Sequence, residues 1–170
     1  MRDVAPPETL DPADFRKQMS LFATGVCVVS VDSGDDGLSA MTINSFVSVS
    51  LEPMLVCWSL HNSSSQFDAF ARSQEYAVSI LSDGQAELAL RYAARGVSGL
   101  DETDFIRSEQ NLPVIAGALA HFECRQWKSY PAGDHTMILG EVTGMSDLVH
   151  NGASAAPLVF FDGEFSSIIP

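Results

Sequence analysis

Residues 26–60, VCVVSVDSGDDGLSAMTINSFVSVSLEPMLVCWSL, contain three candidate β-strands and decide the fold class. The first, residues 26–31, is rich in β-branched side chains, which favour strands. The Asp- and Gly-rich cluster at residues 32–37 predicts a turn. Strand patterns resume at residues 38–41 and 54–60. The last of these is almost wholly apolar and is expected to be buried on both faces.

Helical and β patterns alternate irregularly along the rest of the chain. Asp11 and Pro12 are typical of a helix start, and Phe15, Gln18, Met19 and Phe22 form a stripe expected to pack on a sheet. A short helix capped by Ser63 or Ser64, a strand over 76–81 and a second helix from Asp83 follow. Residues 96–112 are expected to form a long surface loop.

The last third is predicted to be β-structure. Strands over 118–127 and 136–143 flank a link at 130–135, and a terminal pair covers 158–161 and 165–169. This order favours a mainly β fold with helices, a closed or partly closed, Greek-key-like antiparallel barrel, over βαβ units. We expect an N-terminal arm over residues 1–10 and a single domain over residues 11–170.

Composition excludes several classes of function. The 170 residues include 22 acidic and 9 basic side chains, for a formal net charge of −13, which argues against a nucleic-acid partner. No apolar run approaches the roughly 20 residues of a membrane-spanning helix, and the N-terminus lacks a signal-peptide pattern. We therefore expect a cytoplasmic protein without membrane association.

Motifs for several common chemistries are missing. The scattered Cys27, Cys57 and Cys124 form no Cys-x-x-Cys motif and are expected to be reduced and buried. The chain also has no Gly-x-Gly-x-x-Gly fingerprint and no P-loop. His121 and Glu123 share one face of a predicted strand but lack the rest of a deaminase motif, so no metal site is predicted.

Three polar clusters carry the candidate chemistry. The first holds uncharged donors and acceptors suited to the edge of a planar heterocycle. The second precedes a helix, where hydroxyl groups and free N–H groups could bind phosphate or act only as caps. The third could place a histidine against a ligand or serve only a turn. The members are Thr42, Asn44, Ser45, Ser48 and Ser50, then residues 62–65, and then Gly133, Asp134 and His135.

The blocks Thr-x-Asn-Ser-Phe-x-Ser-Val-Ser at residues 42–50 and Gly-Asp-His at 133–135 occur in one chain with Gly-Glu-Val at 140–142 and Pro-Leu-Val-Phe-Phe at 157–161. In this combination and order, from about residue 12 to 168, the sequence resembles the short-chain flavin reductases. These are the reductase components of two-component flavin-dependent monooxygenases.

The resemblance implies a split-barrel homodimer of the FMN-binding type, with FMN or FAD at the dimer interface. It implies hydride transfer from NADH or NADPH to the flavin and release of reduced flavin to a partner monooxygenase. It also implies the following roles. Thr42, Asn44 and Ser45 line the isoalloxazine; Ser48, Val49 and Ser50 approach the ring and the ribityl chain; Ser63 and Ser65 meet the phosphate; His135, the candidate catalytic residue, lies beside the flavin and contacts the nicotinamide; Phe165 closes the pocket. Gly133 is a candidate cofactor-binding residue because glycine permits a close approach.

Two other interpretations stay open at this point. A non-catalytic flavin-binding or sensor module on the same barrel would hold flavin tightly without turnover. An interaction protein whose serines are only helix caps would bind no flavin.

Overall fold

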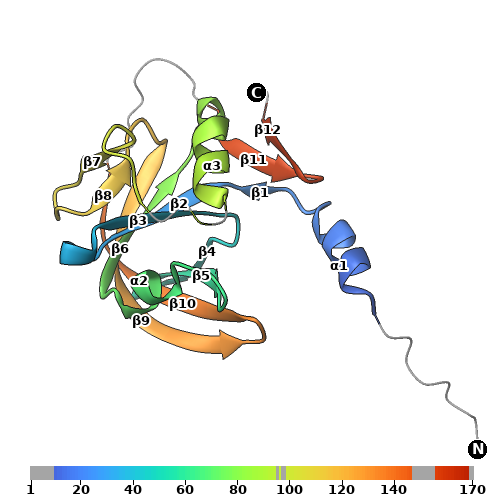
Figure 1. Ribbon diagram of the computed structural model, residues 1–170, viewed down its shortest axis with the longest axis horizontal. Coiled ribbons are helices and arrows are strands. Elements are labelled where there is room, and N and C mark those ends of the chain that lie inside the picture. Colours follow the sequence, from blue (N-terminus) through green and yellow to red (C-terminus); the bar gives the residue numbers. More distant parts are fainter. Residues whose placement is uncertain (1–9, 95, 97–98, 147–155, 169–170) are drawn as a thin grey trace, which may run out of the picture.

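A seven-stranded antiparallel sheet forms the centre of the computed structural model, which describes residues 10–94, 96, 99–146 and 156–168 (Figure 1). The predicted arm at residues 1–10 lies outside the described residues except for Leu10. In spatial order the strands are β3 (Leu38–Ile43), β2 (Cys27–Asp32), β6 (Glu75–Ile80), β9 (Ala120–Ala132), β10 (His135–Met145), β5 (Met54–His61) and β4 (Val47–Leu51).

The sheet curls around one core. Trp58 on β5 and Tyr76 on β6 lie on strands that are separated by two others in the sheet order, yet their rings meet edge-on with centroids 5.9 Å apart. Such contact across the interior requires strong curvature. The edge strands β3 and β4 are consecutive in the chain and are joined by residues 44–46. The expectation of a mainly β, partly closed antiparallel barrel is therefore confirmed.

A second layer covers the outer face of β2 and β3. It contains the 3-10 turn η2 (Asp83–Gln85), the helix α3 (Ala86–Ala93) and a small sheet of β1 (Thr24–Gly25), β11 (Leu158–Phe161) and β12 (Glu164–Ser167). Val28 and Ala40 pack against α3 on this side, whereas Val29 and Val31 point into the barrel core. Burial on both faces explains why the sequence of β2 is almost continuously apolar.

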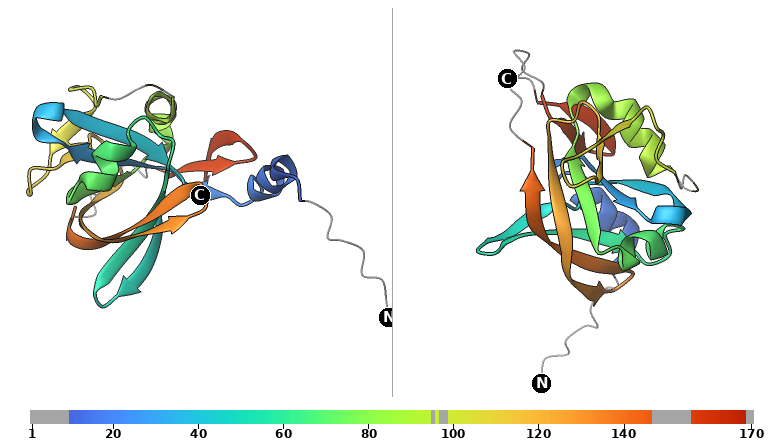
Figure 2. Two further views of the ribbon diagram at one scale, coloured as in Figure 1. Left: turned by 60° about the horizontal axis from the view of Figure 1, so that its bottom comes forward. Right: turned by 90° about the vertical axis from the view of Figure 1, so that its left-hand side faces the viewer.

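Helix α1 (Pro12–Met19) begins as predicted but does not pack as predicted. Asp11 caps it, since the Asp11 Oδ1 atom accepts from the Ala13 N–H at 2.8 Å. Phe15 and Phe22 are nevertheless 64% and 67% exposed, because the helix stands away from the sheet (Figures 1 and 2). The expectation that its apolar stripe packs on the sheet is wrong for the single chain.

Residues 96–112 are more ordered than a surface loop. They contain β7 (Phe105–Arg107), which pairs with β8 (Pro113–Ile115), and the buried side chains of Leu100 and Leu112. Residues 97 and 98 lie outside the described part. The prediction of a loop is wrong for this stretch because so short a strand carries little local pattern and is defined by its partner across the turn.

The β9–β10 hairpin is longer and tighter than predicted. Only Gly133 and Asp134 connect the strands, with Gly133 at φ 66°. His135 therefore starts a strand rather than lying in a six-residue link. Helix α2 (Phe67–Arg72) begins after Gln66, which caps it without a side-chain bond. The expectation that Ser63 or Ser64 caps this helix is wrong.

Candidate active site

Two hollows contain half of the residues of the three polar clusters singled out in the sequence. One, here called the serine hollow, measures about 380 Å³ and the other, the apolar hollow, about 590 Å³. The serine hollow is lined by Met41, Thr42, His61, Ser63, Ser64, Ser65, Gln66, Tyr92, Ala93 and Ala94. The apolar hollow is lined by Phe15, Arg16, Met19, Ser20, Phe22, Thr24, Asn44, Ser45, Phe160 and Gly163.

The end of β3 lies between the two hollows. Thr42 lines the serine hollow and its hydroxyl donates to the carbonyl of Ala89 at 2.8 Å, which ties β3 to α3. Asn44 and Ser45 follow the strand and line the apolar hollow. The Ser45 hydroxyl oxygen accepts from the Ser59 N–H at 3.0 Å and so fixes the path of the chain from β3 toward β4.

Ser48, Val49 and Ser50 lie on β4, the edge strand of the sheet. The β4–β5 register shifts between Ser48 and Ser50, which leaves Val49 as a bulge. Ser48 and Val49 are exposed, and the Ser50 hydroxyl oxygen accepts from the Glu52 N–H at 3.2 Å. These three residues do not line either of the two hollows within one chain.

The hairpin tip that carries His135 lies against the loop that carries the serines. His135, the first residue of β10, pairs in register with His61, the last residue of β5, and the two rings meet edge-on at 4.7 Å. Asn62 locks this junction: its N–H donates to the Asp134 carbonyl at 2.9 Å, and its Oδ1 atom accepts from the Thr136 hydroxyl at 2.8 Å.

Asp134 fixes the ring of His135. Its Oδ1 atom lies 2.7 Å from His135 Nδ1, and this hydrogen bond lowers the pKa of the Asp134 carboxyl. A carboxylate only accepts hydrogen bonds, so Nδ1 carries the ring proton and Nε2 is left as the atom available to a ligand. The Gly133 carbonyl also accepts from the Asn62 amide, at 3.4 Å.

Phe165 lies on β12 and stacks edge-on with Phe160, with centroids 5.6 Å apart. Phe160 and Gly163 line the apolar hollow, and Phe165 packs behind Phe160 against the second core. In this chain Phe165 therefore supports the wall of the apolar hollow.

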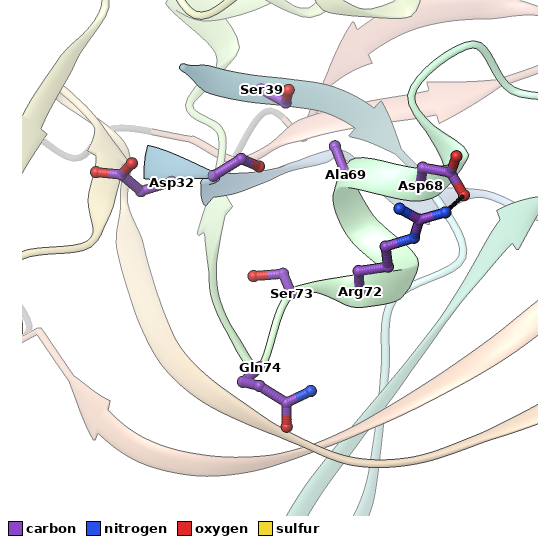
Figure 3. Close-up of a pocket in the computed structure, with 8 residues that line it drawn as sticks. Asp32, Ser39, Asp68, Ala69, Arg72, Ser73 and Gln74 are labelled. Atoms are coloured by element: carbon purple, nitrogen blue, oxygen red, sulfur yellow. Dashed lines mark ion pairs between the residues drawn. The ribbon is translucent and has the colours of Figure 1, made fainter. Parts of the chain in front are cut away.

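A third hollow, of about 430 Å³, lies beside α2 and contains no residue predicted for the site (Figure 3). Its charged side chains are already paired. Arg72 lies 3.3 Å from Asp68, and Asp32 lies 2.6 Å from Arg107. This arrangement gives no free charge to a ligand and favours the two hollows above.

The serine hollow has few cationic side chains near it. Among the residues that the structure describes, its lining includes no lysine or arginine. Arg91 on α3 pairs with Asp104 at 2.5 Å, and the Tyr92 hydroxyl donates to the same carboxylate at 2.6 Å. Burial and this bond raise the pKa of Tyr92, which is therefore neutral. Phosphate bound here would meet hydroxyl groups, backbone N–H groups and the His61 imidazole.

The structure places His61 and Thr24, which were not predicted from the sequence, at the site beside Asn62 of the predicted serine cluster. His61 lines the serine hollow, Asn62 joins it to the hairpin tip, and Thr24 lines the apolar hollow. The Thr24 hydroxyl is buried without a hydrogen-bond partner in the described part of the chain. An orphaned hydroxyl beside a mainly apolar cavity fits an aromatic ligand with polar edge atoms. Only the position of His61 beside the serines could have drawn attention to it in the sequence.

Comparison with known proteins identifies the family. The model of the flavin reductase-like domain matches residues 19–168. The FMN reductase (NADH) SmoA of Agrobacterium fabrum is 41% identical over 151 residues, covering 89% of this chain and 83% of that protein. The flavin-dependent monooxygenase reductase subunit HsaB of Rhodococcus jostii is 30% identical over 164 residues, covering 96% and 81%.

A solved structure shows the same fold. The NADH:FAD oxidoreductase SgcE6 of Streptomyces globisporus, in complex with NAD and FAD fragments, superposes with a TM-score of 0.84 at 35% identity, covering 96% of this chain and 98% of that one. The chain belongs to the flavin reductase-like domain family.

Proposed function

We propose that this protein is an NADH-dependent flavin reductase that supplies reduced FMN or FAD to a separate monooxygenase. The observation that carries the proposal is the junction of two polar clusters, in which Asn62 and Asp134 hold the serine loop and His135 together. Relatives named as NADH-dependent flavin reductases and as a monooxygenase reductase subunit support the same activity.

Each part of the site receives a role in this proposal. The ring is bound beside uncharged groups that can stabilise added negative charge. The phosphate is bound in the serine hollow, and the nicotinamide lies against the hairpin tip. The residues are Thr42, Asn44 and Ser45 for the ring, Ser48, Val49 and Ser50 for the ring and ribityl chain, Ser63 and Ser65 for the phosphate, Gly133 and His135 for the nicotinamide, and Phe165 for closing the pocket.

The bound nicotinamide supplies a hydride and the bound flavin accepts it, so the chain itself needs no nucleophile. His135 acts by orientation: Asp134 holds Nδ1–H, and Nε2 is left to accept a hydrogen bond from the nicotinamide amide. Thr42 and Ser45 are already held by Ala89 and Ser59, so the ring-binding segment is in place before the ligand arrives.

We also propose a homodimer, a single catalytic domain over residues 11–170 and a cytoplasmic location. The exposed apolar side chains of α1 and β4 support the dimer. The three free, buried cysteines support a reducing compartment. In the described residues, no helix is both long enough and apolar enough to cross a membrane.

The test is a coupled measurement of binding and turnover. Purified protein is titrated with FMN and FAD by flavin fluorescence, and nicotinamide oxidation is then followed with each flavin. We expect flavin-dependent oxidation of NADH. Tight flavin retention with negligible turnover would indicate a sensor module. Absence of flavin binding, or of oxidation of both NADH and NADPH, would overturn the proposal.

A further inference from the structure

His61 is the one side chain in the described lining of the serine hollow that can carry a positive charge. Arg91 forms an ion pair with Asp104. A phosphate group carries roughly −1.5 to −2 charges near neutral pH, and the chain has a net charge of −13. A local cation would therefore strengthen the binding of a phosphate here.

The hydrogen bonds of His61 define its protonation state. Its Nδ1 atom accepts from the backbone N–H of Ser63 at 3.1 Å and lies 3.0 Å from the Ser63 hydroxyl oxygen. A backbone N–H can only donate, so Nδ1 holds a lone pair and the ring proton lies on Nε2. Nε2 faces the Oδ2 atom of Asp134 at 3.8 Å. Both donors of Ser63, its N–H and its hydroxyl, are thus turned toward Nδ1.

A second proton on His61 would change the hollow in two ways. Nδ1 could no longer accept from Ser63, so the N–H and hydroxyl of Ser63 would become available to a ligand. The wall of the hollow would also gain a cation next to those donors, and charge-assisted hydrogen bonds to phosphate are the stronger kind. Imidazoles generally change charge between about pH 5 and 8.

The groups that face His61 can accommodate a second proton on its ring. Asp134 presents Oδ2 to it, while Oδ1 is used by His135. The His135 ring lies edge-on to the His61 ring, with centroids 4.7 Å apart. Its hydrogen bond to Asp134 uses Oδ1 and leaves Oδ2 for a protonated His61. Across the hollow Tyr92 is neutral and bonded to Asp104.

We propose that His61 is the cationic phosphate-recognition residue of this site, in place of a lysine or arginine, and that its protonation releases Ser63 to the phosphate. This proposal rests on the proposed function, because it assigns the flavin phosphate to the serine hollow. It makes affinity for phosphorylated flavin depend on pH, while affinity for the ring system alone does not.

The experiment compares FMN with riboflavin, which lacks the phosphate, by fluorescence titration at about pH 6 and about pH 8.5, on either side of the usual imidazole range. We expect His61→Gln to weaken FMN binding about three- to tenfold at the lower pH and less than about twofold at the higher pH. Riboflavin binding should be unchanged at both. The phosphate of FMN titrates in this range as well, but this effect is common to all variants and cancels in the ratio of variant to wild type.

Two further variants complete the design. His61→Lys carries its charge at both pH values and should bind FMN more tightly than the wild type does at the higher pH. His121→Gln, at the far end of the sheet from the hairpin tip, is the matched control and should behave as wild type. Thermal melting of each variant reports on folding.

The assignment would be overturned if His61→Gln bound FMN at the lower pH as tightly as the wild type does. It would also be overturned if this variant lost riboflavin affinity in parallel, or if His61→Lys did not gain FMN affinity. These results differ from failure of the proposed function itself. In that case the wild-type protein would bind neither FMN nor riboflavin and would oxidise no NADH.

Discussion

In the part of the chain that the structure describes, the His135 ring has one side-chain hydrogen bond, from Nδ1 to Asp134, and the proposed function assigns its Nε2 atom to the nicotinamide. We therefore expect His135→Ala to lower kcat/KM for NADH about tenfold or more, the usual effect of losing an orienting hydrogen bond. The Kd for flavin should change less than about twofold. Steady-state kinetics with NADH varied, combined with flavin titration, measures both. Equal losses would mean that His135 serves only the structure of the hairpin tip.

Gly140 on β10 is required by a close approach of the barrel wall to Tyr76. A Cβ atom at this position would lie 2.8 Å from Tyr76 Cζ and closer still to its hydroxyl oxygen, and Tyr76 is 1% exposed and cannot move away. Gly140→Ala should lower the free energy of unfolding by about 1–3 kcal/mol, measured by urea denaturation.

The matched control for this substitution is Gly84→Ala. A Cβ atom there would have no neighbour within 4 Å, so we expect a change within about 0.5 kcal/mol. Equal stability of the two variants would show that the barrel core tolerates the extra methyl group at Gly140.

At the scale of elements, α1 has an apolar stripe that the described residues of one chain leave uncovered. Phe15, Met19 and Phe22 line the apolar hollow from one side, and Phe160 lines it from the other. Leaving such side chains in water forfeits about 1.5–3 kcal/mol each, so the proposed dimer would place a second copy over this stripe.

The substitutions Phe15→Asp and Phe22→Asp should therefore convert a dimer into a monomer of 18.3 kDa and weaken flavin binding. Light scattering and flavin titration measure the two effects. Lys17→Gln, on the same helix, should leave both unchanged. A wild-type protein that is already monomeric and binds flavin normally would contradict the expectation.

For the whole molecule, the buried thiols predict a loss of stability in alkali. Burial raises the pKa of Cys27 and of Cys124 from 9.0 to about 12. Because the folded-state pKa is raised, the stabilisation is complete below pH 9 and is lost as the pH rises from 9 toward 12. The free energy of unfolding should fall by up to about 1.4 kcal/mol per pH unit for each thiol.

Urea denaturation under reducing conditions at pH values on either side of the ordinary thiol pKa tests this dependence. Cys27→Ala combined with Cys124→Ala should flatten the alkaline slope. An unchanged slope in that variant would assign the dependence to other groups, such as Tyr76, whose pKa burial also raises.

The mainly β antiparallel barrel was predictable from local pattern, whereas the flavin ligand was implied by the resemblance to the short-chain flavin reductases. The β-branched run at residues 26–31 and the turn cluster at 32–37 define the first hairpin whatever the surroundings. The prediction of strands was wrong where the pairing partner of a strand lies elsewhere in the chain. The strand β7 depends on β8, and the register of β9 and β10 extends the hairpin to a two-residue turn. Neither pairing has a local signature.

The sequence by itself determined the composition of the site: uncharged donors at residues 42–50, serines at 62–65 and a Gly-Asp-His tip, in a chain with few cations. Only the tertiary structure decided which of these meet. The in-register pairing of His61 with His135, across 74 positions of sequence, brings the serine loop, Asp134 and both imidazoles together. The tertiary structure also places Asn44 and Ser45 in the apolar hollow and Thr42 in the serine hollow. The reason is physical: side-chain chemistry is a local property of the chain, whereas its neighbours are set by strand register and by the curl of the sheet around a shared core.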